Sequence, residues 1–63
     1  MKTATIETYR QYGSRYDYYY ADVYYRGRRV ARMEGHIERE VVKQGQEWVL
    51  KNGFTHYKLK RRN

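Results

Sequence analysis

The stretch YDYYYADVYYRGRRVARMEG (residues 16–35) decides how this chain folds. Six of its first ten residues are tyrosines. Read with a two-residue period, these residues fall into two sets of different character, which predicts a strand with one buried face. Asp22 decides which face is buried, because an unpaired carboxylate is costly to bury. We therefore expect Ala21 and Val23 to point inward. The outward positions are Tyr16, Tyr18, Tyr20, Asp22 and Tyr24.

A tight turn and a third strand follow in the same stretch. Arg26-Gly27-Arg28 predicts a hairpin connection, because glycine adopts positive φ angles without strain. The chain then returns as a strand over residues 29–34, for which Ala31 and Met33 inward is the better register. A slip of one residue would instead turn Val30 inward between arginines.

The segment before this stretch predicts a first strand. Residues 3–12 alternate, with Ala4 and Ile6 on one face and Tyr9 on the other. Gly13-Ser14 marks the turn to the second strand, because both residue types favour turn geometry. Tyr9 would then join the outward tyrosines.

A helix and a last strand are expected after Gly35. Apolar residues recur at helical spacing over residues 36–51, and Asn52-Gly53 is a good helix stop. Residues 54–60 alternate again, which predicts a short strand. The apolar side of the helix carries Ile37, Val41, Val42, Gly45, Trp48 and Val49.

Together these elements predict an α+β fold. We expect a small antiparallel β-sheet in the order β-β-β-α-β, with one helix packed on one face. The length allows a single domain over residues 1–63, in which residues 61–63 form a frayed basic tail. Gly45 on the apolar helix side indicates a close approach of helix and sheet. The expected core is Ile6, Ala21, Val23, Val41, Val42, Trp48, Val49 and Leu59.

Length, charge and the absence of cysteine indicate the compartment in which the protein is expected. Fourteen Lys and Arg stand against seven Asp and Glu, which gives a net charge of +7, and there is no cysteine to form a disulfide. No apolar run approaches the roughly 20 residues of a membrane span, and the first residues do not look like a signal peptide. We therefore expect a cytoplasmic protein without membrane contact. So short a chain gains from self-association, so a homodimer is expected.

Tyrosines and basic residues gather on the outward face of the expected sheet, and the chain has nine tyrosines. Aromatic rings on a sheet stack on bases, and Arg and Lys neutralise phosphates. The pattern predicts a non-enzymatic nucleic-acid-binding protein, with DNA favoured over RNA, such as a phage or prokaryotic accessory factor. The predicted nucleic-acid-binding residues are Tyr16, Tyr18, Tyr20, Tyr24, Arg26, Arg28, Arg29, Arg32, Lys58 and Lys60.

Two other interpretations stay open. Tyr and Arg are also favoured hot-spot residues of protein interfaces. The same face could therefore bind a host protein, as a phage-encoded inhibitor of a host nucleic-acid machine would, whether anti-defence or antitoxin-like. Cross-strand tyrosines could also simply stabilise a small sheet whose charge serves solubility. Binding to DNA with a steep salt dependence would favour the first function, and a complex with one protein at high salt the second.

No catalytic or metal site is expected. His36 and His56 stand twenty residues apart without a third ligand at a recognisable spacing. Ser14 lacks the glycines two residues before and two residues after it that a nucleophile elbow requires, and the glycines of the chain do not form a phosphate-binding motif. The sequence therefore predicts no enzyme activity, no metal and no cofactor.

Part of the chain resembles known DNA-binding sheets. The stretch YYRGRRV (residues 24–30), with the order of three strands and a helix over residues 16–52, is similar to the sheet-type DNA-binding domains of phage integrase arms. This resemblance implies a sheet that contacts DNA through arginines. The last strand departs from that pattern, and the full order is also similar to small antitoxin domains of the HicB type and to phage-encoded inhibitor proteins. No family is assigned.

Overall fold

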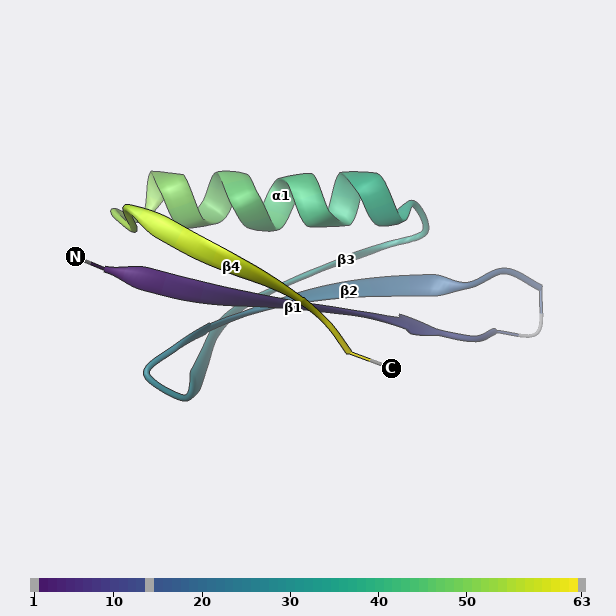
Figure 1. Cartoon of the computed structure of the whole chain (residues 1–63). Helices are drawn as coiled ribbons and strands as arrows, with labels where there is room; N and C mark the ends of the chain where they lie inside the picture. The colour runs from purple at the N-terminus through teal and green to yellow at the C-terminus, as the bar shows by residue number, and fades with distance from the viewer. Residues whose placement is uncertain (1, 14, 63) are drawn as a thin grey trace.

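The computed structural model describes residues 2–13 and 15–62. Three strands, one helix and a fourth strand follow one another along the chain, and the helix packs on one face of the sheet (Figure 1). This order confirms the predicted α+β fold class. Within the described residues, no helix is long and apolar enough to cross a membrane. The elements are β1 (Thr3–Gln11), β2 (Tyr18–Tyr25), β3 (Arg28–Gly35), α1 (Glu38–Lys51) and β4 (His56–Arg61).

The four strands form one sheet in the order β3-β2-β1-β4. The pairs β1–β2 and β2–β3 are antiparallel as expected, whereas β4 pairs parallel with β1, so the complete sheet is mixed. The helix provides the crossover that a parallel strand pair requires. β3 and β4 are the two edges of the sheet, and the expected homodimer stays a prediction.

The turn between β2 and β3 has two residues, and both have positive φ angles. Arg26 lies at φ 54° and Gly27 at φ 77°, which is the combination that matches the twist of a two-residue hairpin. Ala31 pairs with Val23, which confirms the inward register expected for β3. The register then shifts by one residue, because Val30 is the extra residue of a β-bulge.

The core lies between α1 and the sheet. Its buried apolar residues are Ala4, Ile6, Ala21, Val23, Val41, Val49 and Phe54. Val42 and Trp48, expected in the core, are only half-buried. The expectation for Leu59 is wrong, since 54% of it is exposed. Leu59 pairs with Ile6 and points to the helix side, but α1 packs mainly over β2 and β3 and leaves the edge strand β4 uncovered.

The C-terminal cap of α1 places Phe54 in the core. Gly53 adopts φ 84°, its N–H donates to the Leu50 carbonyl at 3.4 Å, and the Phe54 N–H donates to the Val49 carbonyl at 3.2 Å. This double closure is the Schellman motif, which brings the residue after the glycine against the last turn of the helix. Phe54 therefore packs with Val49 and precedes β4 rather than starting it.

Gly45 marks the closest approach of α1 to the sheet, as expected. A Cβ atom at this position would lie 3.6 Å from Ala21 Cβ and 3.6 Å from Ile6 Cγ2. These are ordinary van der Waals distances, so the contact is close and still leaves room for a methyl group.

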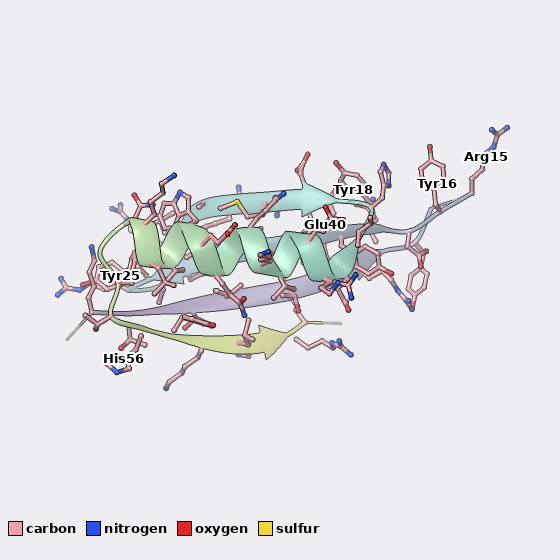
Figure 2. All side chains as sticks on the ribbon, turned by 90° about the horizontal axis from the view of Figure 1, so that it is seen from above. Arg15, Tyr16, Tyr18, Tyr25, Glu40 and His56 are labelled. Atoms are coloured by element: carbon pink, nitrogen blue, oxygen red, sulfur yellow. The ribbon has the colours of Figure 1, made fainter. Side chains whose placement is uncertain are left out.

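The β1–β2 hairpin extends past the start of α1 and past the end of β4 (Figure 1). It accounts for the elongated shape, which measures 42 Å along its longest axis. Figure 2 shows Arg15 and Tyr16 near its tip, at the opposite end of the molecule from Tyr25 and His56. Tyr12 and Tyr16 are 73% and 67% exposed. Ser14, expected in this turn, lies outside the described residues.

Candidate nucleic-acid interface

The face of the sheet opposite α1, called the outer face below, is arranged in rows by the strand register. Paired residues of neighbouring strands share a face, so each row crosses all or part of the sheet. The basic row consists of Lys58, Thr5, Tyr24 and Arg29. The next row consists of Lys60, Glu7, Asp22 and Arg32. The third row contains Tyr9, Tyr20 and Glu34.

Asp22 and Arg32 form an ion pair in the middle of the outer face. Arg32 Nε donates to Asp22 Oδ1 at 2.7 Å and Arg32 Nη2 donates to Oδ2 at 3.0 Å, which is a bidentate pair. The Asp22 side chain is 1% exposed and that of Arg32 34% exposed. These bonds to Asp22 raise the pKa of Arg32 above its ordinary value. Asp22 faces away from the helix as expected, but it is fully buried and paired rather than solvated.

Two tyrosines complete the outer cluster, defined here as Tyr9, Tyr20, Asp22 and Arg32. The rings of Tyr9 and Tyr20 stack with centroids 4.8 Å apart and planes 15° apart. The Arg32 guanidinium carbon lies 4.8 Å from the centroid of the Tyr20 ring, and Arg32 Nη2 donates to the Tyr9 hydroxyl at 3.2 Å. The ring surface of Tyr20 and the charge of Arg32, both predicted to contact nucleic acid, are thus already engaged within the protein.

Tyr18 and Tyr16 belong to a second aromatic group around His36. The Tyr18 and Tyr16 rings each meet the His36 ring edge-on with centroids 4.8 Å apart, and the Tyr18 hydroxyl donates to Glu34 Oε1 at 3.3 Å. Burial, and next the Glu34 carboxylate, raise the pKa of the Tyr18 phenol above its ordinary value. Tyr16 lies before β2 rather than within it, so the predicted strand was two residues too long at this end.

The basic row brings together Tyr24, Arg29 and Lys58, each of which the sequence predicts to bind nucleic acid. At about 4.8 Å between neighbouring strands, the row spans about 14 Å from Lys58 on β4 to Arg29 on β3. Both cations are exposed and Tyr24 is half-buried between them. Within the described part of the chain, neither cation forms an ion pair. This row therefore presents an aromatic ring between two cations that no neighbouring carboxylate neutralises.

The remaining hairpin arginines, Arg28 and Arg26, lie on the helix side of the sheet and in the turn. Arg28 pairs with Tyr25, whose ring packs against Phe54 under the helix, so Arg28 belongs to the helix side. With Ala31 and Met33 inward, strict alternation would place Arg28 on the outer face with Arg32, but the bulge at Val30 reverses the alternation and that expectation is wrong. Arg26 sits in the turn itself, with its guanidinium 5.3 Å from the Tyr25 ring centroid.

β4 ends one residue later than expected. Arg61 is the last residue of β4, and the Arg62 N–H donates to the Thr8 carbonyl at 2.6 Å. The frayed tail stays a prediction. Asn63 lies outside the described residues. The Arg62 guanidinium is 5.7 Å from the Tyr9 ring centroid and thus on the outer face. Lys58, Lys60 and Arg62 therefore form a line along β4.

No match was found. No protein-family model, no curated protein and no solved structure matches this chain.

Sequence reasoning missed two features of this face. Arg62 continues the alternation of Lys58 and Lys60 at intervals of two residues, and that period could have placed it on the outer face. The pairing of Asp22 with Arg32 depends on the β2–β3 register, which the sequence left open by one residue.

Proposed function

We propose that this protein binds nucleic acid without catalysing a reaction, and that an extended strand lies along β4 on its outer face with a base stacked in the basic row. The observation that carries the proposal is the placement of Tyr24 between Arg29 and Lys58, two exposed cations without a carboxylate partner among the described residues. Base stacking on an aromatic side chain contributes about 1–3 kcal/mol, and cations on both sides neutralise phosphates.

The line of cations along β4 suits a sugar–phosphate backbone. Lys58, Lys60 and Arg62 point to the same face two residues apart, so their Cα atoms are about 6.6 Å apart along the strand. That spacing is comparable to the separation of successive phosphates in an extended strand. With the backbone along β4, the bases extend across β1 towards Tyr24.

Arg26 provides independent support for a role of charge at the hairpin. An L-residue in the left-handed region costs roughly 1–2 kcal/mol, and asparagine or glycine adopts this region more readily. The chain nevertheless has an arginine at φ 54°. A cation kept at a strained position is what a phosphate contact at the turn would require.

The experiment is a binding titration by fluorescence anisotropy with labelled single- and double-stranded DNA and RNA at several salt concentrations. Tyr24→Ala should lower single-strand affinity by about 1–3 kcal/mol with little change in salt slope. Lys58→Ala or Arg29→Ala should reduce the salt slope by about one unit for each phosphate that the variant no longer neutralises.

Matched controls separate the face from net charge alone. Lys43→Ala and Arg39→Ala each remove one exposed cation from α1, on the far side of the molecule. They should change affinity much less than Lys58→Ala and Arg29→Ala. Equal reductions from both pairs, or affinity no stronger than that of heptalysine, would contradict the proposal.

A second candidate function is the binding of an acidic protein partner on the same face. It is favoured by the outer cluster, in which Tyr9, Tyr20 and Arg32 are already fixed against one another. Preorganised Tyr and Arg side chains are typical hot spots of protein interfaces. This function predicts that Tyr24→Ala and Arg29→Ala leave nucleic-acid affinity unchanged.

A further inference from the structure

A notch opens in the sheet where β4 stops before β1 does. β4 ends at Arg61, opposite Thr8, while β1 continues to Gln11, so among the described residues the last part of β1 pairs with no residue of β4. The notch has a volume of about 340 Å³. This lies at the lower end of the range for small-molecule sites, roughly 300–1,000 Å³. Its walls include Arg10, Arg61, Arg62, Tyr9, Tyr12 and Tyr19.

Three arginines from two distant parts of the sequence meet in this notch. Arg10 Nη1 lies 3.6 Å from Asp17 Oδ2, and Arg61 Nη2 lies 3.7 Å from Glu38 Oε1. Glu38 also lines the notch. Both distances exceed the roughly 2.7–2.9 Å of a charge-assisted hydrogen bond. Arg61 and Arg10 therefore keep guanidinium donors for another anion, and Arg62 has no ion pair among the described residues.

The backbone of β1 adds a further donor. The Thr8 carbonyl points towards β4, where it accepts the Arg62 N–H. Because backbone groups of alternate residues in a strand point to the same side, the Arg10 N–H also points to that side, beyond the end of β4. Arg10 donates a side-chain hydrogen bond to the Tyr12 hydroxyl, which holds the guanidinium along the wall of the notch.

We propose that this notch binds the terminal phosphate of a nucleic-acid strand through Arg10, Arg61 and Arg62. The inference rests on the proposed function and extends it, since the line of Lys58, Lys60 and Arg62 leads along β4 directly into the notch. A phosphate monoester suits the site better than an internal phosphodiester, because it offers an additional charge and three oxygens to several donors. The protein thereby distinguishes the end of a strand from its interior.

The test compares three single-stranded oligonucleotides of the same sequence, about ten nucleotides long, with a 5′-phosphate, a 3′-phosphate or hydroxyls at both ends. Affinities are measured by competition anisotropy on the full chain. One of the two phosphorylated strands should bind about tenfold more tightly than the hydroxyl strand, a difference of ~1.4 kcal/mol. Arg10→Ala should abolish this advantage and lower the affinity for the hydroxyl strand no more than Arg39→Ala does, because Arg10 pairs with Tyr19 on the helix side.

Arg39→Ala on α1 serves as the charge-matched control and should keep the advantage. Circular dichroism of each variant checks that it is folded. Equal affinity for all three strands would overturn the terminal-phosphate site while leaving the outer face as the binding surface. Binding of inorganic phosphate that depends on Arg10, without binding of any strand, would overturn the proposed function and with it the assignment of strand ends.

Discussion

Removal of Arg32 should destabilise the fold far more than removal of any other exposed arginine of β3. Arg32→Ala deletes two hydrogen bonds of 2.7 and 3.0 Å and leaves the Asp22 carboxylate, 1% exposed, without a counter-charge. Breaking a buried pair from one side costs about 3–5 kcal/mol. Because a third of Arg32 is exposed and water can enter once it is gone, the lower end, about 3 kcal/mol, applies.

That destabilisation is large for this chain. At about 0.05–0.15 kcal/mol per residue, 63 residues give a total stability of roughly 3–9 kcal/mol. Urea unfolding followed by the fluorescence of Trp48 measures the decrease by linear extrapolation. The control is Arg29→Ala, which removes the same charge from the same strand without breaking an ion pair and should cost at most about 0.5 kcal/mol.

The double variant Asp22→Leu/Arg32→Met distinguishes a buried pair from general packing. Replacing both partners by apolar residues leaves no unpaired charge and should recover most of the stability that Arg32→Ala removes. If Arg32→Ala costs no more than Arg29→Ala, the outer cluster does not stabilise the sheet as argued. Arg32 would then be free to bind a ligand.

Four further substitutions test other parts of the structure. Gly45→Ala should stabilise the protein by about 0.5–1 kcal/mol in a thermal melt, since a methyl group fits there and favours the helix; a lower melting temperature would contradict this. Arg26→Asn should raise the free energy of unfolding by about 0.5–1 kcal/mol, because asparagine adopts φ 54° more readily, yet it should weaken strand binding. Gly27→Ala should lower the free energy of unfolding by about 1 kcal/mol. Stability changes of the opposite sign would refute the turn geometry. Tyr18 has a raised pKa, so its contribution to stability is present below about pH 10 and disappears as the pH rises through the folded pKa. Tyr18→Phe should therefore lose less stability than the parent between about pH 9 and about pH 11 in urea titrations, and an equal decrease would count against the burial of Tyr18 beside Glu34.

The sequence was sufficient for the elements and their inward faces, because alternation and helical spacing are local properties. Ala21, Val23 and Val49 had to be buried for the strand and helix patterns to have any interior. Leu59 fitted the same pattern and is exposed, since its burial depends on which strands the helix covers. Phe54 was missed as a core residue, because its burial depends on the hydrogen bonds of the Schellman motif, which bring it against the last turn of α1.

The candidate site was predicted only in part. Tyr24, Arg29 and Lys58 were each recognised, but their common row follows from strand order and from the bulge at Val30. Nothing local to Arg32 indicates that its charge is neutralised ten residues away, by Asp22. The alternation of residues therefore predicted features that depend on a single strand, and it did not predict contacts that depend on how two strands pair.

The most direct test of the outer face as a binding surface is a titration of the protein with a single-stranded oligonucleotide, followed by backbone amide chemical shifts. If a strand binds at the basic row, the largest shifts will occur along it, at Thr5, Tyr24, Arg29 and Lys58, with smaller ones along β4. The amide resonance of Lys43, on the far side of α1, should not shift. Shifts centred on α1, or shifts spread evenly over all the cationic residues, would show that the outer face is not the binding surface.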